Sequence, residues 1–224
     1  MDHLQQRSQR RPLRADAERT VQAILAAAER VLSAQPAATM EQIAEAAGVA
    51  RTTVHRRFAT REALVDALTA WATQQFHQAV ESARPESTPP LVALYQVTAN
   101  VLRVKISWGF AMSRPAPEDP EVARVHADVL DQCDQLFRRA RDAGVLRADA
   151  DLDWTRRVYY ALIHEAARSR TGRTGPTDSA GPTDRRTGPP VSGPREPDDV
   201  DELATLVVDT LLRGMGAPGA TFAP

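Results

Sequence analysis

Four arginines lie close together in one short stretch of this sequence, "ARTTVHRRFATRE", which covers residues 50–62. They are Arg51, Arg56, Arg57 and Arg61, and no acidic residue lies between the first and the last of them. A guanidinium group carries five N–H donors in a rigid fork, which suits phosphate oxygens and the O6 and N7 atoms of guanine. Because the whole chain has a formal net charge of −1, this concentration of positive charge predicts a local anionic partner.

A helix over residues 51–58 would divide these side chains between two faces. At 100° per residue, Val54 and Phe58 point the same way and would anchor the helix in a core, while Thr52 and Arg56 point away from it. Short hydroxyl side chains let a helix enter the major groove of DNA, where arginine binds guanine with two hydrogen bonds. The neighbouring residues are expected to flank this surface or to reach phosphates at its edges: Thr53, His55, Arg57 and Arg61.

The segments on either side carry the signals of a helix-turn-helix. An apolar three–four spacing predicts a first helix from Ala15. Thr39 is an expected N-cap, and Gln42 three residues later completes a capping-box pattern. Gly48 tolerates the positive φ that a tight turn requires. Thr60 is an expected N-cap for a further helix that runs to about residue 83.

Two runs carry a resemblance to a known family: "TVQAILAAAERVL" at residues 20–32 and "ATMEQIAEAAGVARTTVHRRFATREALVDAL" at residues 38–68. Through them, the segment from Arg19 to about Trp71 resembles the DNA-binding domain of TetR-type transcriptional regulators. The resemblance implies a homodimer that binds a double-stranded DNA operator, usually as a repressor. It also implies release of that operator when a small-molecule effector enters the C-terminal domain. The residues that would contact DNA are Thr39, Arg51, Thr52, Thr53, His55, Arg56 and Arg61.

The resemblance also implies individual roles. Thr39 would touch a phosphate from the start of its helix, and Arg61 would meet the DNA backbone. His55 stands where the family commonly has Tyr, so its phosphate contact would depend on an imidazole and become sensitive to pH. Ala50 stands where the family often has Ser as N-cap, a loss of about 1 kcal/mol in helix stability.

The remainder of the chain also has helical patterns, so the expected fold class is all-α. Helices are expected at about 91–113, 121–143, 153–170 and 200–213, with Gly214 ending the last. The segment 171–199 is rich in Pro, Gly, Thr and Asp, which predicts a flexible insertion. The expected domains are a flexible basic arm at 1–14, a helix-turn-helix domain at 15–72, and a helical regulatory and dimerisation domain at 73–218. The arm would either enter a minor groove or add only nonspecific attraction to DNA.

The C-terminal part holds large apolar side chains that could line an effector cavity. The alternative for each of them is an ordinary place in the core. Helices 153–170 and 200–213 are the candidates for a dimer interface. The candidate cavity residues are Trp71, Trp108, Phe110, Met112, Phe137, Tyr159 and His164.

Other functional classes find little support in the sequence. The single cysteine, Cys133, excludes an intramolecular disulfide. No apolar run is long enough for a membrane span, so a cytoplasmic protein is expected. No catalytic, metal or cofactor motif is present, and His126 seven residues before Cys133 is weak support for a metal or thiol sensor. Two hypotheses remain: a ligand-gated transcriptional regulator, or a helical small-molecule-binding protein or enzyme that uses the helix-turn-helix only as a scaffold.

Overall fold

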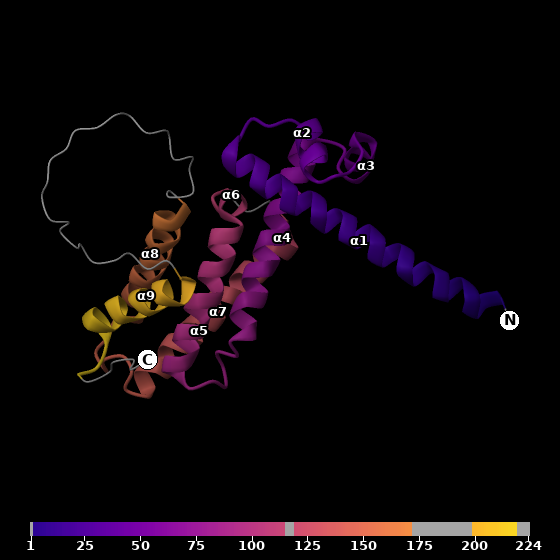
Figure 1. The fold of residues 1–224 in the computed structure, drawn as a ribbon. Helices are drawn as coiled ribbons and strands as arrows, with labels where there is room; N and C mark the ends of the chain where they lie inside the picture. The colour runs from indigo at the N-terminus through magenta and orange to yellow at the C-terminus, as the bar shows by residue number, and fades with distance from the viewer. Residues whose placement is uncertain (1, 115–118, 172–198, 219–224) are drawn as a thin grey trace, which may run out of the picture. The chain divides into compact units, whose positions relative to one another are not determined.

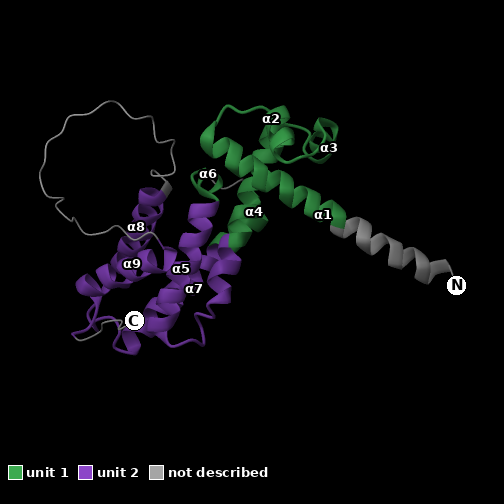
Figure 2. Cartoon of the chain, in the orientation of Figure 1, with its two compact units in different colours: residues 1–75, 108–126 green, residues 76–107, 127–224 purple. Residues whose placement is uncertain are grey.

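The computed structural model describes residues 2–114, 119–171 and 199–218 (Figure 1). The expected all-α class is confirmed, because the described residues form nine helices and their only β-type pairing is an isolated bridge between Leu146 and Gly216. The chain divides into two compact units (Figure 2): one comprises Met1–Gln75 and Trp108–His126, the other Phe76–Ser107 and Ala127–Pro224. The insertion expected at 171–199 lies almost wholly outside the described residues.

Helix α1 comprises Asp2–Ala34. The sequence placed its start at Ala15, and the structure places it at Asp2. Apolar spacing gave no signal over residues 2–14, but the Gln, Leu and Arg in this segment have high helix propensity. Later in α1, Ile24, Leu25 and Leu32 are buried in the core of the first unit.

Two short helices follow, α2 (Met40–Ala46) and α3 (Arg51–Arg57). The capping box is present: the Thr39 hydroxyl accepts from the Gln42 N–H at 3.3 Å, and the Gln42 side chain accepts from the Thr39 N–H at 2.8 Å. Gly48 has φ +67°, as the tight turn was expected to require. The Val49 N–H then donates to the Ala44 carbonyl at 3.0 Å and closes the turn between the helices.

The first unit is completed by the start of α4 (Arg61–Ser82) and by α6 (Gly109–Met112). The Thr60 hydroxyl accepts from the Ala63 N–H at 3.1 Å, so the expected N-cap of α4 is confirmed. The single helix expected over 91–113 is wrong, because Trp108 has φ −125° and ψ 41° and interrupts it. Gly109 follows this break, which fits the low helix propensity of glycine. The short α6 packs against α1.

The second unit is built from α5 (Pro90–Ser107), most of α7 (Pro120–Asp142), α8 (Leu152–Thr171) and α9 (Val200–Met215). Helix α5 packs against both α8 and α9. The expectation that Gly214 ends the last helix is wrong, since glycine inside a helix costs only about 1 kcal/mol. The helix ends at Met215, and Gly216 follows as its C-cap, where a Cβ atom would lie 2.4 Å from the Leu212 carbonyl oxygen.

Candidate nucleic-acid interface

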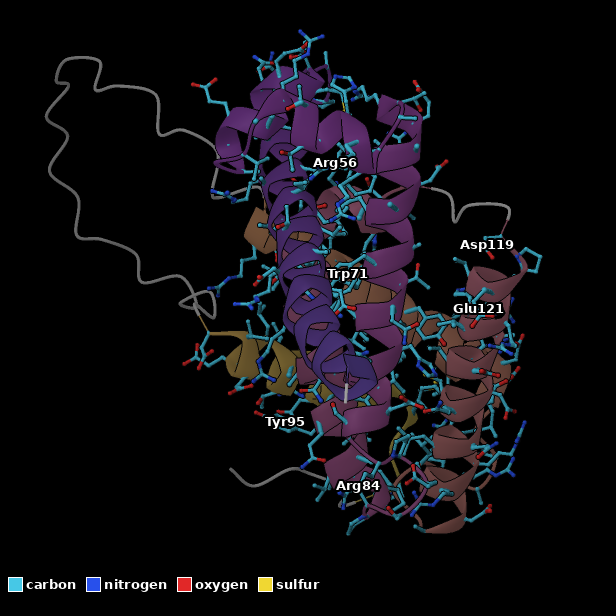
Figure 3. The ribbon with its side chains drawn as sticks, turned by 90° about the vertical axis from the view of Figure 1, so that its right-hand side faces the viewer. Arg56, Trp71, Arg84, Tyr95, Asp119 and Glu121 are labelled. Carbon is cyan, nitrogen blue, oxygen red and sulfur yellow. The ribbon has the colours of Figure 1, made fainter. Side chains whose placement is uncertain are left out.

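The short helix α3 is held by its apolar face and presents its polar face outward. Val54 is fully buried and Phe58 is 8% exposed, and both belong to the core that α1, α2 and α4 share. Thr52 is exposed, and so is Arg56 (labelled in Figure 3), as the helical spacing predicted. Around them, Arg51, His55 and Arg57 are exposed and Thr53 is half-buried. The outward face of α3 therefore consists of hydroxyl, imidazole and guanidinium groups.

Arg51 is engaged at the start of this face. Its guanidinium forms a 2.7 Å ion pair with Glu41 of α2 and donates from Nε to Nε2 of His55 at 3.5 Å. The backbone N–H of Glu41 itself lowers the pKa of its carboxyl, and Thr39 and Arg51 lower the pKa further. Both partners of the ion pair are largely exposed, so it orients Arg51 and contributes little stability.

Arg61 lies where α4 begins and is half-buried. It donates to the carbonyl oxygens of Pro36 and Ala38. These carbonyls belong to the segment just before Thr39, which is exposed and caps α2. In this fold, Arg61 therefore holds the residues that position Thr39.

The N-terminus of α3 has no side-chain cap. Ala50 has φ −64° and ψ 143°, the extended conformation usual for an N-cap residue, but its methyl group cannot accept a hydrogen bond. Its carbonyl accepts from the Thr53 N–H at 2.8 Å. This helix is therefore anchored by the packing of Val54 and Phe58 and not by its cap.

The residues expected to line an effector cavity fall into different parts of the fold. Trp71, Trp108, Phe110 and Met112 pack against the core of the first unit. Phe137 and Tyr159 are buried in the second unit and meet edge to face, with ring centroids 5.4 Å apart. His164, another of the expected cavity residues, is exposed on α8.

Two features near these residues were missed by sequence reasoning. One is a surface hollow of about 400 Å³ in the first unit, and Trp71 is the one residue of its lining that was among the expected cavity residues. The other is Glu29, an acid that is only 4% exposed; its signal was a carboxylate among the apolar residues of "AILAAAERVL". The hollow is lined by Ala17, Glu18, Val21, Gln22, Arg57 and Trp71.

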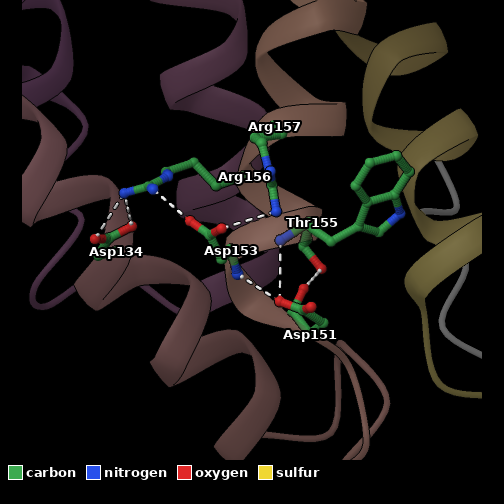
Figure 4. Close-up of polar contacts among 7 residues, drawn as sticks. Asp134, Asp151, Asp153, Thr155, Arg156 and Arg157 are labelled. Atoms are coloured by element: carbon green, nitrogen blue, oxygen red, sulfur yellow. Dashed lines mark hydrogen bonds and ion pairs between the residues drawn. The ribbon is translucent and has the colours of Figure 1, made fainter.

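Polar groups of the second unit serve its packing. Arg156 donates to both carboxylate oxygens of Asp134 at 3.1 Å and to Asp153 at 2.5 Å (Figure 4). The Tyr159 hydroxyl lies 2.8 Å from the Thr98 hydroxyl. Burial raises the pKa of Tyr159 well above its usual range, and the bond to Thr98 offsets part of that rise.

The hypothesis of a metal or thiol sensor gains no support from geometry. His126 is exposed, whereas Cys133 is buried on the same helix, where burial raises the pKa of its thiol. Within the described ranges, no group of three or more His, Cys, Asp or Glu side chains is placed to hold a metal ion. None of the helices in these ranges is long and apolar enough to cross a membrane.

An exposed basic helix behind a glycine turn, anchored on a bundle of helices, defines a helix-turn-helix DNA-binding protein. Comparisons with known proteins agree. The family model described as "Bacterial regulatory proteins, tetR family" matches residues 24–68. The HTH-type transcriptional repressor LfrR of Mycolicibacterium smegmatis is 36% identical over 155 residues, which are 67% of this chain and 80% of LfrR. The HTH-type transcriptional regulator NfxB of Pseudomonas aeruginosa is 30% identical over 65% of this chain and 80% of its own length.

Solved structures show the same fold over most of the chain. The TetR-like regulator LfrR from Mycobacterium smegmatis, in complex with proflavine, superposes with a TM-score of 0.59 at 23% identity and covers 92% of this chain and 99% of its own. The TetR family regulator PfmR from Thermus thermophilus gives a TM-score of 0.62 at 18% identity and covers 85% of this chain and 97% of its own.

The family model and the 36% identical relative LfrR show that the chain belongs to the TetR family. The predicted function, a ligand-responsive DNA-binding transcriptional regulator, is confirmed, and the relatives are regulators and not enzymes.

Proposed function

We propose that the chain is a repressor that binds an inverted-repeat operator as a homodimer in the cytoplasm and leaves it when a small molecule binds. The observation that carries the DNA-binding part is the exposure of Thr52 and Arg56 on a helix whose opposite side, Val54 and Phe58, is buried. Thr52, Thr53 and Arg56 would meet base edges in the major groove. Thr39, Arg51 and His55 would meet bases or phosphates at its margins, and Arg61 would act chiefly by holding the segment before Thr39.

Two exposed apolar side chains support a dimer through α8 and α9. Trp154 on α8 and Leu206 on α9 are each 51% exposed, and a dimer formed through these two helices would cover both side chains. The other apolar residues of α9, such as Leu203, Val207 and Leu211, are buried in the chain's own core and do not add to this surface. A two-fold dimer would place two recognition helices about 34–36 Å apart, one turn of DNA.

The proposed effectors are planar aromatic cations. The support is chemical: the 36% identical relative LfrR has been solved in complex with proflavine, a flat cationic ring system. Such molecules stack on aromatic rings and are attracted by carboxylates. The alternative, a binding protein or enzyme that uses the helix-turn-helix only as a scaffold, has no support among these relatives, since those that match most of this chain are regulators.

Selection of bound sequences from random duplexes tests the proposal, and an inverted repeat is the expected product. Arg56→Ala should then weaken specific binding by about 1–3 kcal/mol and relax one base position. Arg138→Ala, an exposed arginine of α7 in the second unit, is the matched control and should bind within twofold of the parent. Binding should also fall steeply with salt. An Arg56→Ala variant that binds with the parent's affinity and specificity contradicts the proposal.

A further inference from the structure

A buried acid joins α1 to the short helix α6. Glu29 of α1 is 4% exposed. Its Oε1 accepts from the Phe110 N–H at 2.7 Å, and its Oε2 accepts from the Ala111 N–H at 3.1 Å. The Ser33 hydroxyl, one turn later in α1, donates to Oε1 at 3.1 Å. A carboxylate is costly to bury unless it is hydrogen-bonded, so these three donors explain how the core tolerates it.

Glu29 does for α6 what an N-cap side chain normally does. The first N–H groups of a helix have no partner inside the helix, and the residue at the cap position, Trp108, provides no side-chain bond. The two N–H groups that Glu29 accepts from belong to the second and third residues of α6, the positions that a capping side chain serves. Because α6 has only four residues and helices this short are not stable alone, its fold depends on this carboxylate and on the burial of Ala111.

The two ends of this link have different connections in the chain. In one direction, α6 continues through Trp108 into α5, which belongs to the second unit. In the other direction, α1 places Leu25 and Leu32 in the same core cluster as Val54 and Phe58 of the recognition helix. The Glu29 bonds therefore lie on the path along the chain from the end of α5, through α6 and α1, to the core that supports α3.

We propose that Glu29 is the coupling residue between effector and operator, and this proposal rests on the effector-released repressor described above. With the α6 cap made, α1 is held in the position that supports α3, and the operator is bound. With the cap broken, α6 unwinds and that support loosens. Trp108, Phe110 and Met112 then belong to the transmitting segment and need not touch the effector. Since coupling is reciprocal, operator binding must in turn strengthen the cap.

Hydrogen exchange on the full-length chain, with and without the selected operator duplex, tests this reciprocity. In the parent protein, the operator should slow exchange of the Phe110 and Ala111 amides about fivefold or more. Glu29→Gln keeps the shape but turns one acceptor into a donor facing an N–H. It should remove that slowing and lower operator affinity roughly two- to tenfold, the value of one hydrogen bond. Glu86→Gln makes the same charge change at an exposed residue of the second unit and should behave as the parent.

A second measurement separates coupling from mere stability. The ratio of operator affinities without and with saturating proflavine should fall toward one in Glu29→Gln. Lower affinity with an unchanged ratio would mean that Glu29 only stabilises the fold, and would overturn the proposal. Equal operator-dependent slowing in the variant and the parent would overturn it as well. If proflavine fails to release the parent protein, the proposed effector class is wrong, and the exchange measurement alone decides the role of Glu29.

Discussion

Replacing Ala50 by serine should stabilise the recognition helix and tighten operator binding. Ala50 already has the extended φ of −64° and ψ of 143° that an N-cap residue needs, and it is exposed, so a hydroxyl group fits without moving the backbone. The new oxygen can accept from the N–H of Thr52 or Thr53, donors in the first turn of α3. Replacing Ala by Ser at an N-cap is worth about 1 kcal/mol.

The magnitude has two consequences that can be measured separately. For a chain of 150–250 residues, 1 kcal/mol raises the midpoint of thermal unfolding by about 2–4 °C. If α3 is partly frayed without DNA, the same energy raises operator affinity by up to about fivefold, because less ordering remains to be done on binding. Calorimetry measures the first effect, and titration of a labelled operator duplex measures the second.

Two controls isolate the cap from other effects of the substitution. Ala50→Val accepts extended backbone but has no oxygen, so it should give no gain. Ala46→Ser adds the same hydroxyl at the exposed end of α2, away from any N-cap, and should change stability by less than about 0.5 kcal/mol. If Ala50→Ser is no more stable than Ala50→Val, the missing cap is not a weakness of this helix and the reasoning is refuted.

Three further results are expected. Glu41→Gln should leave the stability of the fold almost unchanged, because its ion pair with Arg51 is exposed. It should also tighten operator binding, because Arg51 then breaks no ion pair with a carboxylate when it binds DNA. Weaker binding in a duplex titration would contradict this. Cys133 should resist a thiol reagent at pH 8 in the native chain and react after denaturation, since burial raises its pKa, and rapid native labelling would refute its burial. Leu206→Asp should yield monomers in sedimentation and lose high-affinity operator binding, whereas an intact dimer would place the interface elsewhere.

The helix-turn-helix could be predicted because the residues that determine it lie close together in the sequence. Thr39 and Gln42 are three residues apart and bond to each other, and Gly48 alone provides the positive φ of the turn. Val54 and Phe58 lie one helical turn apart, so their spacing fixes which side of α3 faces the core. The exposure of Arg56 follows from these few residues without knowledge of the rest of the chain.

The features that sequence reasoning missed depend on partners far away in the chain. The burial of Glu29 is tolerated because its carboxylate accepts a hydrogen bond from the Phe110 N–H, 81 residues later in the chain. No local pattern reveals that pairing. The break at Trp108 had one local signal, the low helix propensity of Gly109, but the apolar pattern continues across it. Large aromatic side chains mislead for a related reason, because Phe137 and Tyr159 on apolar helix faces pack against each other in a core as readily as they would line a cavity.

Two of the four arginines at residues 51–61 already have partners within the protein. Arg51 is paired with Glu41, and Arg61 donates to two backbone carbonyls. Arg56 is exposed and has no ion pair with any residue in the described ranges. It can therefore bind a base without first giving up a protein partner, whereas Arg51 must exchange a carboxylate for a phosphate or a base. Since only the difference between new and lost contacts contributes to affinity, Arg56 should carry the largest share of sequence discrimination among these arginines.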